Sequence, residues 1–128
     1  MRGAQARAPE ESVQRLFLRE AAHGVAGIIP EDLDPGNLTV PLGVSTWIVR
    51  SEIDLGQACE AMLELRTAFL AVSGLDQRSE PVPLLGGDRR TSVLTLAVYL
   101  DGLVDRGARM AGSTRAELAE KALDRLAL

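Results

Sequence analysis

The stretch TSVLTLAVY at residues 91–99 decides the fold predicted for this chain, because its apolar residues fit a strand and a helix almost equally well. In the strand interpretation, residues 91–96 alternate between two faces, and a helix begins at about Leu100. In the helix interpretation, Thr91 caps one continuous helix over residues 91–111 with an apolar stripe of Val93, Leu94, Ala97, Leu100, Val104, Ala108 and Ala111. The strand is favoured by the β-branched residues Thr91, Val93, Thr95 and Val98.

The residues after this stretch are easier to interpret. Gly112 and Ser113 predict a turn, and a second helix follows over about residues 114–127. Thr114 and Glu117 have the spacing of a capping box, in which each side chain accepts a bond from the other residue's backbone N–H. The C-terminus is therefore either a strand, a helix, a turn and a helix, or a helical hairpin that packs on an earlier helix.

That earlier helix is predicted over residues 53–73, where an apolar stripe keeps helical spacing and Gly74 follows at the C-cap position. Before it, the short runs 38–40 and 44–49 predict two strands. Residues 30–37 predict a turn-rich segment.

The N-terminus predicts a loose arm over residues 1–9 and then a helix that begins at Glu10 and ends near Gly24. Trp47, the only tryptophan, is expected in the core or in a dimer interface. Arg106 is expected on a solvated face among other charged residues.

Segment 76–88 contains two prolines and two glycines and is the best candidate linker. It divides the chain into a helical or α+β region of unknown role at 1–75 and a C-terminal unit at 89–128. The predicted fold class is mostly α with a small β component, and the alternative is an all-α arrangement that ends in a helical hairpin.

Composition narrows the classes of function. The net charge is −4, and residues 1–87 carry seven Arg and twelve Asp or Glu, whereas residues 88–128 carry a net charge of +1. One cysteine, Cys59, and one histidine, His23, predict no disulfide framework, no metal site and no cofactor. Residues 1–11 lack the apolar centre of a signal peptide, and no apolar run approaches a membrane span, so a cytoplasmic protein without membrane contact is expected.

From Arg90 onward, the strand interpretation resembles the ribbon-helix-helix family of DNA-binding proteins. The resemblance covers about 38 residues: the strand, the first helix, the turn at Gly112 and the last helix. It implies a homodimer or higher homo-oligomer whose paired strands form an antiparallel ribbon that fits the DNA major groove. The chain departs from the family at Val93, an unusual residue to contact bases, and at Gly107, where a large core residue is expected.

The candidate DNA site follows from the alternation of the strand and from the start of the last helix. Base edges would be contacted by Thr91, Val93 and Thr95, and phosphates by Arg89 and Arg90. Backbone N–H groups at Ser113, Thr114 and Arg115 would bind a further phosphate.

Two functions remain open on the sequence alone. The first is a DNA-binding regulator of the repressor, antitoxin or partition type, in which residues 1–75 bind a protein partner. The second is a helical interaction or assembly protein without a nucleic-acid role. An enzyme is not expected, because Gly86 and Gly87 are not followed by the residues of a phosphate loop, and no motif joins Ser45 or His23 to a catalytic acid.

Overall fold

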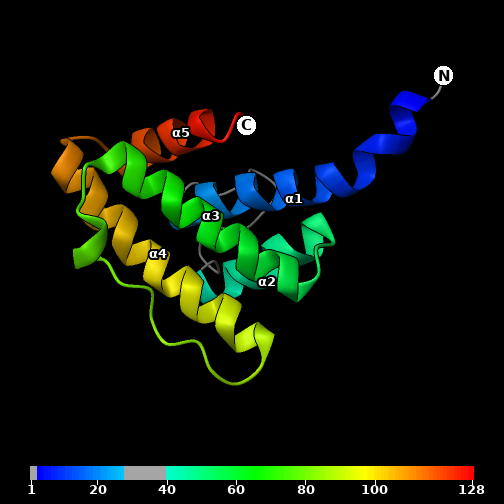
Figure 1. Cartoon of the computed structure of the whole chain (residues 1–128), viewed down its shortest axis with the longest axis horizontal. Helices are drawn as coiled ribbons and strands as arrows, with labels where there is room; N and C mark the ends of the chain where they lie inside the picture. The colour runs from blue at the N-terminus through cyan, green and yellow to red at the C-terminus, as the bar shows by residue number, and fades with distance from the viewer. Residues whose placement is uncertain (1–2, 28–39) are drawn as a thin grey trace.

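The computed structural model describes residues 3–27 and 40–128. In this part of the chain there are five α-helices: α1 (Gly3–Val25), α2 (Val40–Ser51), α3 (Leu55–Ser73), α4 (Arg89–Ala111) and α5 (Arg115–Arg125). A short 3₁₀ helix, η2 (Gln77–Ser79), lies between α3 and α4. These residues contain no strand, so the all-α alternative describes the fold (Figure 1).

The strand predicted at residues 91–96 is wrong, because these residues lie inside α4. The helix begins earlier than expected: Asp88 is the N-cap and its side chain accepts the N–H of Thr91 at 2.7 Å. One face of α4 is buried along its length, at Val93, Leu96, Ala97, Leu100, Leu103, Val104, Gly107 and Ala108. A strand would place neighbouring Leu96 and Ala97 on opposite faces, whereas the helix buries both against the same core.

The turn and the last helix are as predicted. Gly112 ends α4 with a φ of 67°, a left-handed conformation that glycine adopts without strain. The capping box is present, since Thr114 Oγ1 accepts the N–H of Glu117 at 3.0 Å and Glu117 Oε1 accepts the N–H of Thr114 at 2.8 Å. The two helices form a hairpin, and both pack on α3.

The N-terminal half differs from the sequence prediction at two places. Residues 44–49, predicted as a strand, lie in α2, and α1 already begins at Gly3, so residues 3–9 are helical. Val40 begins α2, while the rest of the predicted strand 38–40 and the predicted turn at 30–37 lie outside the described residues.

Trp47 lies in the core, where α1 and α2 pack together. A Cβ atom added at Gly24 would lie 2.0 Å from Trp47 Cζ2, and one added at Gly43 would lie 3.1 Å from the same atom. The absence of side chains at these two glycines therefore makes room for the indole ring.

The helices α3 and α4, which pack against each other in the core, run in the same direction. Cys59, near the start of α3, contacts the backbone of Arg89 at the start of α4, and Ser73, at the end of α3, lies against Gly107 near the end of α4. The chain must therefore return along the length of α4 before that helix begins, and Figure 1 shows this return as a long connection.

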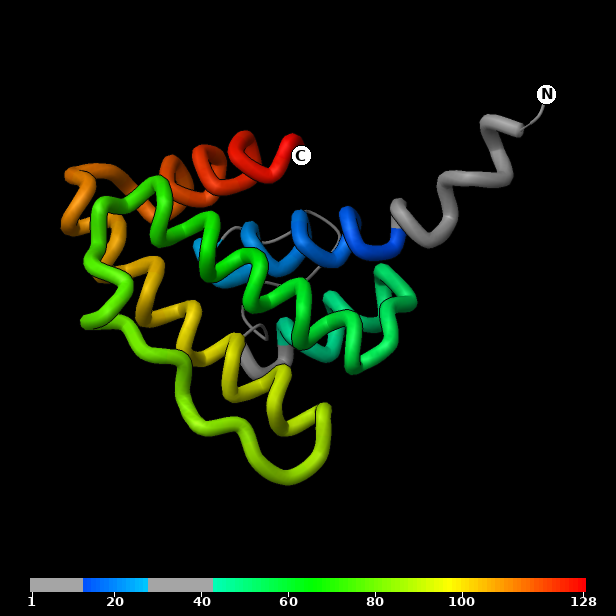
Figure 2. Tube along the Cα trace, viewed as in Figure 1, coloured from blue at the N-terminus to red at the C-terminus, as the bar shows by residue number. Residues whose placement is uncertain are grey.

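Segment 76–88 is this connection, and the helices on either side of it share one core. Buried side chains from α1, α2, α3, α4 and α5 belong to a single apolar cluster. In Figure 2, α3 runs alongside α4 and passes in front of α1 in this view, and the connection runs beside α4 on the outside of the molecule.

Candidate interaction site

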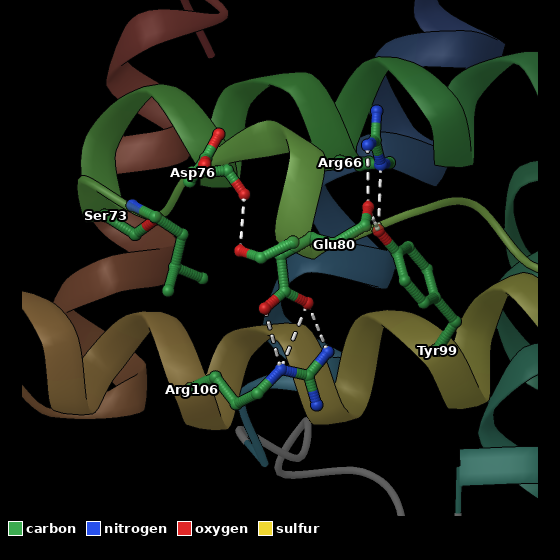
Figure 3. Close-up of polar contacts among 8 residues, drawn as sticks. Arg66, Ser73, Asp76, Glu80, Tyr99 and Arg106 are labelled. Carbon is green, nitrogen blue, oxygen red and sulfur yellow. Dashed lines mark hydrogen bonds and ion pairs between the residues drawn. The ribbon is translucent and has the colours of Figure 1, made fainter.

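Glu80, which follows η2 within the long connection, fixes this segment to both neighbouring helices. Its backbone carbonyl accepts hydrogen bonds from Arg66 Nη2 of α3 and from the Tyr99 hydroxyl of α4, both at 2.8 Å. The Tyr99 hydroxyl in turn accepts a bond from Arg66 Nε at 2.8 Å. These contacts, shown in Figure 3, join the two helices and the connection at one point.

The side chain of Glu80 is 7% exposed and pairs with Arg106 of α4. Arg106 Nε lies 3.1 Å from both carboxylate oxygens, and Nη2 lies 2.6 Å from Oε1. Hydrogen bonding to Glu80 raises the pKa of Arg106. We name Arg66, Glu80, Tyr99 and Arg106 the Glu80 clamp.

The local sequence explains why these groups meet. Tyr99 and Arg106 are seven residues apart, so two turns of α4 place them on the same side of the helix. Asp76 caps η2 by accepting the N–H of Arg78 at 3.0 Å, and this tight turn brings Glu80 back over α4. The sequence prediction placed Arg106 on a solvated face, but its guanidinium holds the connection.

Beyond the clamp, residues 81–87 form an exposed loop with the sequence Pro-Val-Pro-Leu-Leu-Gly-Gly. Leu84 is 99% exposed, and Val82 and Leu85 are exposed as well. Among the residues that the structure describes, none makes a hydrogen bond to the backbone of this loop. The loop therefore presents apolar side chains and unpaired peptide groups to solvent.

The loop connects two fixed points on α4. At its first end, Glu80 lies beside Tyr99 and Arg106 of α4. At its second end, Asp88 is the N-cap of α4, so the loop runs back along this helix to its start. The point on the axis of α4 midway between Tyr99 and Arg106 lies about 20 Å from Arg89. The nine peptide links from Glu80 to Arg89 reach at most about 30 Å, and Pro81 and Pro83 restrict the backbone further.

A hollow of about 240 Å³ lies beside the clamp on the outer face of α3. Its lining combines apolar and polar side chains: Arg66, Thr67, Leu70, Ala71, Leu75 and Gln77. We name it the α3 hollow, and Arg66 belongs both to its wall and to the Glu80 clamp.

The residues predicted to bind DNA are not brought together. Arg89, Arg90, Thr91, Val93 and Thr95 lie in the first two turns of α4, and Ser113, Thr114 and Arg115 lie beyond its other end. The 23-residue helix between them is about 35 Å long.

Several of these groups already have partners within the chain. Val93 is fully buried, so no base can reach it in this fold. Arg90 Nη2 donates to Ser45 Oγ at 2.9 Å, and Arg115 pairs with Asp101 and donates to the Val25 carbonyl. The capping box occupies the N–H of Thr114.

The site lacks the arrangement of a nucleophile and a base. The Tyr99 hydroxyl and the Glu80 carboxylate are both engaged within the clamp. Burial raises the pKa of the Cys59 thiol, which holds it in the less nucleophilic protonated form. His23 lies at the end of α1, 3.6 Å from Glu120, and no group of three or more His, Cys, Asp or Glu able to hold a metal occurs in the described ranges.

No protein family, no curated protein and no solved structure matches this chain. Across residues 3–27 and 40–128, no helix has both the length and the apolarity needed to cross a membrane.

Proposed function

We propose that this protein is a non-enzymatic helical interaction module that contacts a partner through the exposed loop at residues 81–87. One observation carries the proposal: Leu84 is 99% exposed on a loop that is held at both ends. A leucine that touches nothing contributes no packing to its own fold, whereas its burial against a partner stabilises the complex by about 2 kcal/mol.

The way the loop is held also supports the proposal. The Glu80 clamp and the Asp88 cap fix its ends, and Pro81 and Pro83 limit its conformations. A partner therefore loses less conformational entropy by binding this loop than by binding a flexible one. Extended segments with unpaired peptide groups and apolar side chains are a recurrent form of peptide recognition.

The test is site-specific photo-cross-linking in cells of the source organism. A photoreactive amino acid replaces Leu84 in one variant and Val49 in the control, since Val49 is 74% exposed on α2, a different element of the fold. We expect a discrete cross-linked product from position 84 that position 49 does not give. If position 84 gives no product, or the same products as position 49, the proposal is wrong.

DNA binding stays a prediction of the sequence. It is favoured by the exposed side chains of Arg89 and Arg90 at the start of α4 and by the net charge of +1 over residues 88–128. It requires a salt-sensitive gel shift on duplex DNA that the double substitution Arg89→Ala and Arg90→Ala removes. If no shift occurs at low salt, the prediction is wrong.

A further inference from the structure

We propose that the loop at residues 81–87 binds an aromatic-lined groove on a different protein, in the manner of a polyproline II ligand. This inference rests on the proposed function, because it names the kind of partner that the same loop contacts. It is carried by the spacing of buried and exposed residues along the loop and by the two prolines at its start.

Burial repeats every three residues from Glu80 onward. The side chain of Glu80 is 7% exposed and Pro83 is partly buried, so these two residues face the body of the protein. The other side chains of the stretch are exposed: Pro81, Val82, Leu84 and Leu85. A strand would place Glu80 and Leu84 on the same face, but Leu84 is 99% exposed. A period of three is that of polyproline II, a left-handed helix with three residues per turn and no internal hydrogen bonds.

The sequence restricts the stretch to the same conformation. Pro81 and Pro83 hold φ at about −65°, which is close to the polyproline II value. A residue before a proline is confined to the extended region, and Val82 precedes Pro83. Three successive residues are therefore limited to polyproline II or a conformation near it.

The length of the loop fits this conformation. At about 3.1 Å per residue, the five steps from Glu80 to Leu85 cover about 16 Å of the roughly 20 Å that the loop returns along α4. Gly86 and Gly87 then lead into the Asp88 cap, and Gly87 turns the chain with a φ of 77°.

Two edges of the stretch are open to a partner, and both are apolar. Pro81 and Leu84 share one edge, and Val82 and Leu85 share the other. No residue from 81 to 87 is charged, so the complementary surface is apolar. Grooves lined by aromatic rings are the surfaces that bind such ridges, and their Trp N–H and Tyr hydroxyl groups donate to the free carbonyls of the ligand.

A second copy of this chain does not offer such a groove. The chain contains one Trp, one Tyr and two Phe. Phe17, Phe69 and Trp47 are at most 6% exposed, and the hydroxyl of Tyr99 is engaged in the Glu80 clamp. The aromatic groups must therefore come from a different protein.

The experiment measures photo-cross-linking from position 84 of the full-length protein in cells of the source organism, with an aliphatic photoreactive residue of the size of leucine. Two changes alter the loop backbone in opposite directions. The double substitution Pro81→Ala and Pro83→Ala adds two N–H groups and releases φ, whereas Val82→Pro removes one N–H and fixes φ. Gly86→Ala is the control, because a Cβ atom at this position meets no atom within 4 Å.

We expect a product in which position 84 is joined to a partner segment that contains aromatic residues. Its yield should fall about fivefold or more in the double substitution, because a less restricted loop loses more conformational entropy on binding. The yield should stay equal or rise in Val82→Pro and stay equal in Gly86→Ala. All these positions lie outside the buried core, so folding is preserved.

Pairing of the loop with the edge of a partner's sheet predicts the opposite changes, because that mode of binding depends on the N–H groups of the loop. A yield that is unchanged in the double substitution, or lost in Val82→Pro, would overturn the inference while the interaction function stands. So would a cross-link to a second copy of this chain or to a partner segment without aromatic residues. If position 84 gives no product even with the native prolines, the interaction function itself is lost.

Discussion

Replacing Glu80 with glutamine removes the charge that holds the connection to α4 but keeps the size of the side chain. In the native protein the carboxylate accepts bonds from Nε and Nη2 of Arg106 at 2.6–3.1 Å. The introduced glutamine can retain one of these bonds through its amide oxygen. The change therefore isolates the charged part of the Glu80 clamp.

The magnitude follows from the burial of the two partners. Glu80 is 7% exposed and Arg106 is 47% exposed, so the pair is neither fully buried nor fully solvated. Loss of one partner costs about 3–5 kcal/mol for a buried pair and about 0–1 kcal/mol for an exposed one. We expect Glu80→Gln to lower the free energy of unfolding by about 1.5 kcal/mol, between those limits.

Urea unfolding measures this loss, and Arg109→Gln is the matched control. Arg109 lies on the same helix and pairs with Asp105 at 2.8 Å, but both side chains are exposed, so that its replacement should cost less than about 0.5 kcal/mol. At a typical slope, about 1.5 kcal/mol lowers the midpoint by about 1 M urea. Backbone ¹⁵N order parameters at Val82, Leu84 and Leu85 should fall in Glu80→Gln only. Equal midpoints and equal order parameters in the two variants would refute the role assigned to the clamp.

Three further substitutions test how the fold is built. Gly24→Ala places a methyl group 2.0 Å from Trp47 Cζ2 and should lower the free energy of unfolding, measured by thermal unfolding, by about 1–3 kcal/mol. The control Gly86→Ala meets no atom within 4 Å and should change this free energy by less than about 0.5 kcal/mol. Equal effects of the two substitutions would contradict the packing described for Trp47. Thr114→Ala breaks the capping box of α5 and should lower the free energy of unfolding by about 1 kcal/mol, whereas Thr114→Ser keeps the hydroxyl and should retain most of it. An unchanged Tm in Thr114→Ala would argue against the cap. The hydrogen bond from the N–H of Thr91 holds the pKa of Asp88 below its usual value. The stability that this cap provides is therefore fully present at a pH above the usual pKa of aspartate. It is lost as the pH falls through the lowered pKa of the folded state. Amide protection factors in the first turn of α4, which correct for the intrinsic effect of pH on exchange, should therefore fall in acid, less so in Asp88→Asn, and identical acid profiles would count against this cap.

The sequence predicted the elements whose signals are local. Gly74 and Gly112 end α3 and α4 in left-handed conformations, and the capping box at Thr114 and Glu117 lies where its spacing indicates. In each case one or two neighbouring residues determine the backbone conformation. The helix at 53–73 was also recognised, since its apolar stripe continues over many turns.

The fold of residues 91–99 is not determined by local signals. Their β-branched residues favour a strand, but a helix is stabilised by the neighbouring α3, which accepts a continuous buried face from Val93 to Ala108. Residues 44–49 fold as a helix for a related reason, because Val44 and Trp47 meet the same core three residues apart. In both segments, tertiary packing overrides strand propensity.

The candidate site was missed because its residues are distant in the sequence. Glu80 lies 14 residues from Arg66 and 26 from Arg106, and no short motif joins them. The available signals were a charged residue directly before a proline-containing apolar run, and Tyr99 and Arg106 at a spacing of two helical turns. Neither signal identifies a contact unless the direction of α4 relative to α3 is known.

The account depends most directly on α4 being one helix, because only then do Tyr99 and Arg106 hold Glu80 and fix one end of the exposed loop. Backbone chemical shifts of Thr91 to Tyr99 in the full-length protein in solution measure this. We predict helical shifts without interruption from Arg89 to Ala111, and slow amide exchange at Leu96 and Leu100. Extended shifts over residues 91–96, together with contacts between these residues in two chains, would contradict the account and support a paired ribbon.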